Sequence, residues 1–232
     1  MNHTDFINHP LSKEEKIFGT VWLLFETFLF ATILQVVNLL MPTPLSQPTV
    51  NFIFFGTNFT VVAIIFRKYL LGQLRLIPGS FWVILGAALL GFILYLRLNA
   101  LWMQIIFALD PDFISINDAA VEELVAEDYT LMFLGTVILV PITEECLFRG
   151  LIFRGIYDRS PVLAWILSIT LFACVHILGY IGAFPVKTIL LCFIQYIPAG
   201  LCLAGAYRFS GCLLAPILIH TLVNLLGMLA LR

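Results

Sequence analysis

The stretch Val140-Pro-Ile-Thr-Glu-Glu-Cys-Leu-Phe-Arg-Gly150 places three charged side chains inside an apolar run that extends over residues 131 to 156. A run of this length is what a helix needs to cross a hydrocarbon layer about 30 Å thick. Ionisable groups inside such a run are costly, so each of them marks a functional site by default. The stretch therefore predicts a membrane-spanning helix with a polar site.

The composition of the whole chain agrees with a membrane environment. Of its 232 residues, 61% are hydrophobic and 11% are charged, and the mean hydropathy is +1.04. Soluble domains are roughly 45–50% apolar and about 25% charged. The net charge of -2 and the absence of a basic stripe in the sequence argue against a nucleic-acid partner. The lipid bilayer is the expected partner.

Seven apolar segments are long enough, or nearly so, to form membrane spans. We therefore expect an all-α fold, a polytopic transmembrane helical bundle forming a single membrane domain over residues 1–232. Turns are predicted at the prolines and glycines between the segments, including Pro78-Gly79. The third segment is long enough either to tilt strongly or to break near Arg97 to Asn99, and a break would add an eighth short helix, which gives seven to eight spans. The segments are residues 17–41, 50–71, 80–108, 131–156, 161–178, 188–207 and 212–231.

The first of these runs is too long for the core of a signal peptide and lacks a small-x-small cleavage site, so we expect it to be a retained span. Basic residues near span ends set orientation. If seven spans alternate in direction, most of the basic residues near span ends fall on one side of the membrane. This predicts a multi-pass protein of the cell membrane with a cytoplasmic amino terminus. They are Lys13, Lys16, Arg67, Lys68, Arg75, Arg154, Arg159 and Arg208.

The opposite side carries a segment from Asp110 to Asp128 with seven acids and no base. Charge runs in loops usually only solvate them, so we interpret this segment as a connector rather than a site.

The two adjacent acids of the fourth span are predicted to differ in role. Residues four apart share a helix face, so Glu145 pairs with Arg149, and Glu144 points toward another helix. An arginine keeps its partner acid ionised, whereas a buried acid without such a partner can act as a general base. The alternative is that both acids and Arg149 only hold helices together.

Two further spans contribute histidines. Phe172 and His176 are four residues apart, as are His220 and Asn224, so each pair shares a helix face. Alone, His176 is more typical of a hydrogen-bonded core histidine, and Asn224 of a helix-to-helix hydrogen bond. Two other buried ionisable residues, Glu26 and Arg97, have no partner that the sequence identifies.

Together, the four polar groups could share one cavity. At 1.5 Å per residue, Glu144, His176, His220 and Asn224 lie roughly 12 to 21 Å from the cytoplasmic helix ends. A Glu and a His can deprotonate a water, and a His and an Asn can donate hydrogen bonds to the oxygen that becomes negative when this water attacks a peptide carbonyl. This combination predicts peptide hydrolysis without a covalent intermediate, and without a cofactor.

Other hydrolytic chemistries fit the sequence less well. The five cysteines lie in or against apolar segments and are expected to be packing residues. Cys174 and His176 are two apart and do not face each other on a helix, and no Gly-x-Ser-x-Gly motif is present. A zinc site of two histidines and Glu144 is a chemical alternative, although the chain has no His-Glu-x-x-His motif.

In its three motifs the chain resembles the CPBP family of CAAX-prenyl proteases and bacteriocin-processing proteins, also called Abi. The family signature is Glu-Glu-x-x-x-Arg, Phe-x-x-x-His and His-x-x-x-Asn or Asp, each on its own membrane helix. All three motifs occur here in order, and the resemblance covers residues 131–231.

The resemblance implies a glutamate-dependent intramembrane endopeptidase. Glu144 and His176 would activate water, and His220 and Asn224 would form the oxyanion site, with Glu145, Arg149 and Phe172 as supporting residues and no metal. The chain has Tyr180 where some relatives have an asparagine. It resembles the bacterial branch, which is associated with leader-peptide or bacteriocin processing. The substrate would be a peptide or membrane-associated protein, with or without a lipid.

A non-enzymatic alternative follows from the same resemblance. Some members of the family act as membrane scaffolds or in self-immunity against a bacteriocin, and in such a protein the polar residues would only lock helices together.

Overall fold

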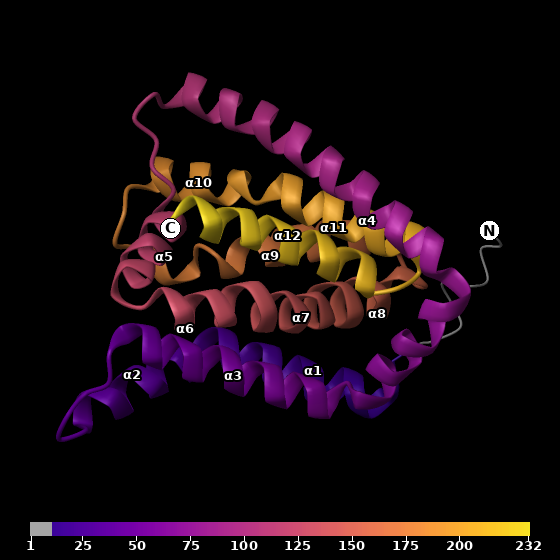
Figure 1. Ribbon diagram of the computed structural model, residues 1–232, viewed down its shortest axis with the longest axis horizontal. Coiled ribbons are helices and arrows are strands. Elements are labelled where there is room, and N and C mark those ends of the chain that lie inside the picture. Colours follow the sequence, from indigo (N-terminus) through magenta and orange to yellow (C-terminus); the bar gives the residue numbers. More distant parts are fainter. Residues whose placement is uncertain (1–10) are drawn as a thin grey trace.

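The computed structural model describes residues 11–232, and the described residues are helical throughout apart from short connections. The all-helical prediction is confirmed for the described part of the chain. Figure 1 shows the helices stacked in layers, with one long helix crossing all of them.

The first layer is a helical hairpin of the amino-terminal third. It consists of α1 (Lys13–Phe25), a π-helical segment η2 (Glu26–Phe30), α2 (Ala31–Leu40) and α3 (Gln47–Ile65). Ser12 and Glu15 form a capping box that satisfies the first amides of α1. The turn before α3 is fixed by Asn38, whose amide group exchanges two hydrogen bonds with the backbone of Leu45, at 2.7 and 3.1 Å.

The long helix is α4 (Arg67–Leu109), and its start corrects one prediction. The chain turns at Phe66, whose φ and ψ of -93° and 16° leave the helical range, and not at Pro78-Gly79. Both Pro78 and Gly79 are exposed on the side of the continuous helix. A proline removes one hydrogen bond of a helix, and here α4 continues past it. The predicted break between Arg97 and Asn99 is also wrong.

The acidic segment after α4 is more ordered than a solvated connector. It contains α5 (Ile116–Glu127), whose residues Ile116 and Val125 are buried. Asp118 accepts a hydrogen bond of 3.0 Å from the side chain of Gln195. Alternation of apolar and acidic residues thus lets this helix dock on the bundle while most of its acids face outward.

The helix with the paired glutamates runs from Tyr129 to Tyr157 and is the most buried of the membrane-length helices. It is continuous but not uniform. Two π-helical segments flank the short α-helical piece that holds both acids. Its parts are α6 (Tyr129–Phe133), η3 (Leu134–Leu139), α7 (Val140–Glu145), η4 (Cys146–Arg154) and α8 (Gly155–Tyr157).

The last third of the chain supplies the remaining walls of the bundle. Ser160 caps α9 (Pro161–Val175), which ends at His176, and a short 3-10 turn η5 (Leu178–Tyr180) follows. The next helices are α10 (Val186–Gln195), α11 (Ile197–Ser210) and α12 (Leu214–Ala230). Gly211 ends α11 with a φ of 69°, which only glycine adopts at little cost.

Five of the described helices are long and apolar enough to cross a membrane. They are Lys13–Leu40, Gln47–Ile65, Arg67–Leu109, Tyr129–Tyr157 and Val186–Ser210. The predicted spans 161–178 and 212–231 form shorter helices, of 15 and 17 residues. At 1.5 Å per residue these reach about 22 and 26 Å, less than the hydrocarbon thickness of about 30 Å. The structure therefore supports a multi-pass membrane protein, whereas the count of seven to eight spans is not confirmed.

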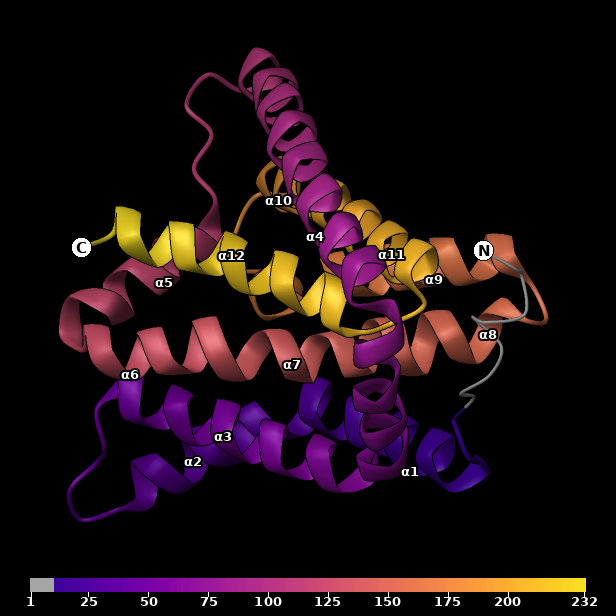
Figure 2. The ribbon, with the colours of Figure 1, turned by 45° about the vertical axis from the view of Figure 1, so that its right-hand side comes forward.

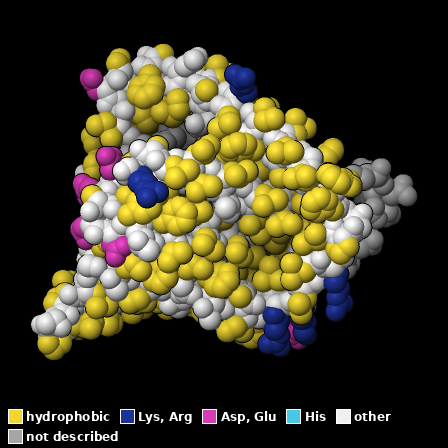
Figure 3. Space-filling view, in the orientation of Figure 1, with side chains coloured by type: hydrophobic (Ala, Val, Ile, Leu, Met, Phe, Trp, Pro, Cys, Tyr) yellow, Lys and Arg dark blue, Asp and Glu magenta, His cyan; other side chains and the backbone are white. Residues whose placement is uncertain are grey.

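The surface agrees with this environment. Figure 3 shows hydrophobic side chains over most of one face and acidic side chains mainly at the end where α5 lies. Several basic side chains lie near the end where α1 begins, and others lie elsewhere on this face. Hydrogen bonds connect helices at the basic end of the bundle. Glu15 of α1 accepts one of 2.9 Å from the backbone amide of Tyr69 in α4. Arg208 of α11 donates one of 2.7 Å to the hydroxyl of Tyr157 in α8. The bundle thus has a basic and an acidic end.

Candidate active site

The predicted ion pair on α7 and η4 is present and completely buried. Nη1 of Arg149 lies 3.0 Å from Oε1 of Glu145, and neither side chain is exposed to solvent. The guanidinium also donates from Nη2 to the carbonyl of Gly200 at 3.3 Å and lies 4.4 Å from the centre of the Phe172 ring. A buried charge needs such partners, so the pair ties η4 to α9 and α11.

His220 of α12 joins this pair. Its Nδ1 lies 2.9 Å from the same Oε1 of Glu145. This oxygen already accepts a hydrogen bond from Arg149, so Nδ1 of His220 carries the hydrogen and donates it. This contact leaves the Nε2 of His220 for a different partner.

His176 is oriented by a different acceptor. Its Nδ1 lies 2.7 Å from the backbone carbonyl of Phe172, one turn earlier on α9. A carbonyl only accepts, so the hydrogen is on Nδ1, and Nε2 of a neutral His176 holds a lone pair. His176 directly follows the last residue of α9 as its C-cap, so no further turn of this helix follows its ring.

Aromatic rings bring the two histidines together. The ring of Phe172 is 4.8 Å from that of His176 and 5.9 Å from that of His220, measured between ring centres. His176 also stacks on Tyr196, with ring centres 4.1 Å apart and an angle of 26° between the ring planes. The three predicted motifs therefore meet around Phe172.

Glu144 makes none of the contacts of its neighbour. Its Oε2 is buried without a hydrogen-bond partner, and its carboxyl group is close enough to interact electrostatically with the hydroxyl of Tyr196. Since Tyr196 stacks on His176, Glu144 points to the His176 side of the site. This separation of the two acids follows from their positions about 100° apart on the helix.

Asn224 is held by a carbonyl that a π-helical segment exposes. Its Nδ2 donates to the carbonyl of Thr136 in η3 at 2.8 Å. In a π-helical register that carbonyl would bond the amide of residue 141, and Pro141 has no amide hydrogen. The amide of Asn224 takes its place, and its second hydrogen is left for another acceptor.

Three contributors to this site were missed by sequence reasoning. Tyr196, Thr136 and Gly200 contact predicted residues only through packing between distant helices. Thr136 and Gly200 act through backbone carbonyls, which any residue provides, and for Gly200 the sequence contains no signal. Pro141 inside an apolar run was an available signal for a free carbonyl one turn earlier.

The arrangement of the described histidine, cysteine and acidic side chains bears on the zinc alternative. Among residues 11–232, no three histidine, cysteine, aspartate or glutamate side chains converge in an arrangement that could hold a metal ion. Glu144, His176 and His220, the set of the zinc alternative, therefore do not form such a cluster in this arrangement.

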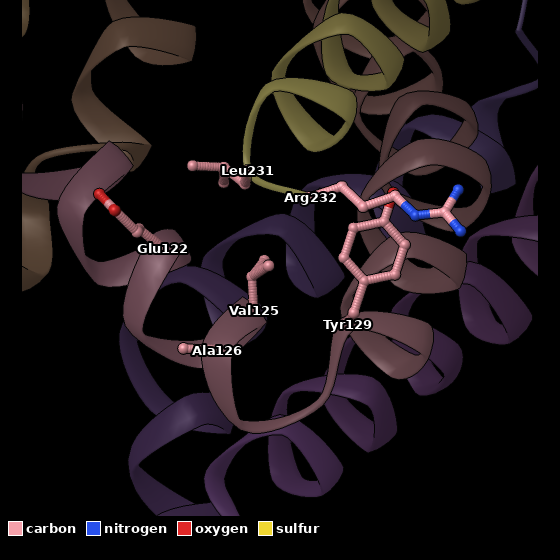
Figure 4. A pocket seen from close by; sticks show the side chains of 6 residues that line it. All are labelled: Glu122, Val125, Ala126, Tyr129, Leu231 and Arg232. Atoms are coloured by element: carbon pink, nitrogen blue, oxygen red, sulfur yellow. The ribbon is translucent and has the colours of Figure 1, made fainter.

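Two cavities lie apart from these residues, at the acidic end. One, of about 460 Å³, is bounded by α5, α6 and the carboxyl terminus, as Figure 4 shows. The other, of about 540 Å³, lies between α5 and the segment before α10. The predicted site residues line neither of them.

Comparison with known families supports the motif-based resemblance. Residues 126–226 match the family model of the Rce1-like type II CAAX prenyl endopeptidases. This segment contains all three motifs, and the match confirms the resemblance to the CPBP and CAAX protease family. Comparisons with curated proteins and with solved structures found no match.

Proposed function

Since the segment with the three motifs matches the CAAX protease family, we propose that this membrane protein is an intramembrane endopeptidase. It would hydrolyse a peptide bond of a membrane-associated protein or leader peptide by Glu144- and His176-activated water. The observation that supports this most strongly is that both histidines have Nδ1 fixed by an acceptor. The Nε2 of His176 is then available to the water, and the Nε2 of His220 to the oxygen of the scissile carbonyl.

The first step is the attack of water on the scissile carbonyl. Nε2 of His176 accepts a hydrogen bond from the water, and the Glu144 carboxylate takes its proton as the new carbon–oxygen bond forms. Stacking on Tyr196 holds the imidazole in place at 4.1 Å.

The negative charge that develops on the carbonyl oxygen needs donors that are already in position. Nε2 of the His220 imidazolium and the second hydrogen of the Asn224 amide are the two proposed donors. Glu145 and Arg149 support His220 and do not touch the substrate. Collapse of the tetrahedral intermediate breaks the carbon–nitrogen bond, and the proton held by Glu144 passes to the leaving amine.

This mechanism requires no metal ion or cofactor, and the substrate is a peptide or protein with or without a lipid. Zinc-dependent hydrolysis and a non-proteolytic scaffold or self-immunity function are the competing outcomes of the test below.

The experiment is a cleavage assay in proteoliposomes. Fluorogenic peptides with and without a prenylated cysteine, and leader peptides from the genomic neighbourhood, are incubated with the wild-type protein and with Glu144→Ala. We expect at least one peptide to be cleaved by the wild-type protein alone. Equal, background-level signals from both proteins on every peptide, with both correctly folded, would favour the scaffold function.

A further inference from the structure

Besides Glu14 and Glu15 in its first turn, the first membrane-length helix contains a third acid, Glu26, which the mechanism above does not use. It lies at the start of the π-helical segment η2 and is half-buried. Segments of π-helix often occur at functional sites. The sequence alone provides no partner for this residue, so its neighbours must come from the structure.

Helix packing places Glu26 beside Glu144. A Cβ atom added at Gly19 of α1 would lie 3.3 Å from Cδ2 of Leu151 in η4, so the two helices are in close contact there. Figures 1 and 2 show α1 and the Tyr129–Tyr157 helix running in opposite directions. Glu26 follows Gly19 by seven residues, and Glu144 precedes Leu151 by seven residues, so on antiparallel helices both acids lie on the same side of this contact along the bundle axis.

The depth of the two acids agrees with this register. Each is thirteen residues from the end of its helix at the basic side, counted from Lys13 and from Tyr157. At the α-helical rise of 1.5 Å per residue, Glu26 lies about 20 Å from that end, and Glu144 lies somewhat closer to it because η4 is π-helical. Their carboxyl groups are also close enough to interact electrostatically.

Other charged groups do not compete for Glu26. The helices α2 and α3, which belong to the same amino-terminal hairpin as Glu26, contain no titratable residue. On the opposing helix, Glu145 and Arg149 bind each other, and Arg154 pairs with Asp158 at the basic end. Cys146 is fully buried. Glu144 is thus the ionisable group that Glu26 faces, and the buried Oε2 of Glu144 has no hydrogen-bond partner.

We propose that Glu26 is a positioning residue for Glu144, with which it shares one proton. Two carboxylates side by side in a medium of low dielectric constant do not both ionise. The protonated Glu26 donates a hydrogen bond to one oxygen of the Glu144 carboxylate and leaves the other oxygen for the water. This proposal rests on the proposed function, since it takes Glu144 as the base.

The shared proton has a consequence for the dependence of activity on pH. When the pair loses this proton at alkaline pH, two negative charges face each other and Glu144 loses its donor. The activity should therefore fall at alkaline pH for a reason that depends on Glu26. A glutamine at this position donates in the same way but cannot ionise.

The test compares Glu26→Gln and Glu26→Ala with Thr27→Val, a control in the same π-helical segment. We expect Glu26→Gln to keep kcat within about 3-fold of the wild type near neutral pH and to lose the alkaline fall in kcat/KM. Glu26→Ala should lower kcat by about 10- to 100-fold, as loss of a charge-assisted hydrogen bond does, with KM little changed. Thr27→Val should behave like the wild type.

Identical pH profiles and full activity for the wild type and both Glu26 variants would overturn the proposal. If Glu26→Ala does not fold, the pH profile of Glu26→Gln decides alone. The Glu144→Gln variant, assayed in parallel, distinguishes failure of the proposal for Glu26 from failure of the assignment of Glu144 as the base. If it is inactive while Glu26 variants are unaffected, only the role of Glu26 is wrong, and if it is active, the assignment of the base is wrong as well.

Discussion

Nδ1 of His220 lies 2.9 Å from Oε1 of Glu145, the same oxygen that accepts the hydrogen bond of Arg149 at 3.0 Å. Two cationic or donating groups from different helices thus share one carboxylate oxygen in a fully buried place. Glu145 therefore has two tasks, because it neutralises Arg149 and sets the hydrogen of His220 on Nδ1.

These two tasks make Glu145→Gln and Arg149→Gln fail differently. Removing one partner of a buried ion pair commonly costs about 3 to 5 kcal/mol, so both variants should be less stable. Glu145→Gln should in addition lose turnover per folded molecule, because the neutral amide no longer stabilises the His220 imidazolium. Arg149→Gln keeps the contact between Glu145 and His220 and should keep more of its turnover.

Thermal unfolding in detergent and active-site-normalised turnover measure the two effects separately. Leu147→Val, a change in the same helix that removes no polar group, is the control for packing. Equal turnover per folded molecule in the two variants would contradict the second task of Glu145.

Glu144→Gln tests the proposed base. The substitution keeps the shape of the side chain but removes proton transfer, which typically contributes about 10² to 10⁴-fold to the rate. We expect a loss of this size in kcat with a melting temperature close to that of the wild type, since Glu144 has no ion pair to break. Retained turnover would show that another group is the base.

Local spacing explains what the sequence could predict of this site. The pairs Glu145 with Arg149 and Phe172 with His176 are four residues apart, and any helix brings such residues together. The contact between His220 and Glu145 spans 75 residues and depends on how α12 packs on α7. Before the structure, only the estimated depth in the membrane and the family resemblance related these two motifs.

Helix ends were harder to predict than helices for a similar reason. A proline removes one hydrogen bond wherever it stands, but its effect depends on what the freed carbonyl meets. At Pro78 the exposed helix side tolerates it, and α4 continues. At Pro141 the chain remains helical because Asn224 provides the missing donor to Thr136. The residues next to each proline in the sequence do not indicate which of these surroundings it will have.

Chelation tests the role of metal. Activation of water by Glu144 and His176 needs no Lewis acid, so turnover in detergent should survive EDTA and 1,10-phenanthroline within about 2-fold. The measurement is kcat/KM before and after dialysis against each chelator. A loss that zinc restores would favour the zinc-dependent alternative.

Orientation in the membrane can be tested at the two ends of the bundle. The basic end should face the cytoplasm. On a cysteine-free background, Arg159→Cys should react with an impermeant maleimide only from the cytoplasmic side, and Asp112→Cys only from the outside. Both residues are exposed, so accessibility does not bias the comparison. The reverse pattern would invert the topology.

Pro141→Ala tests how the oxyanion site is held. An alanine has the amide hydrogen that proline lacks, so in the π-helical register it can bond the carbonyl of Thr136. It then competes with the Asn224 amide, which donates to that carbonyl at 2.8 Å. Stability should be unchanged or higher, since an interior proline is unfavourable in a helix. Turnover should nevertheless fall by about 10-fold, the equivalent of one hydrogen bond.

A loss of activity together with a gain of stability is unusual for a substitution that does not touch the substrate, which makes this variant diagnostic. Asn224→Ala provides the reference, because it removes the donor altogether and should lose at least as much turnover. In the double variant Pro141→Ala with Asn224→Ala, the two losses should not add, since both act through the same amide. Additive losses would mean that Pro141 affects the rate by another route than the Asn224 side chain.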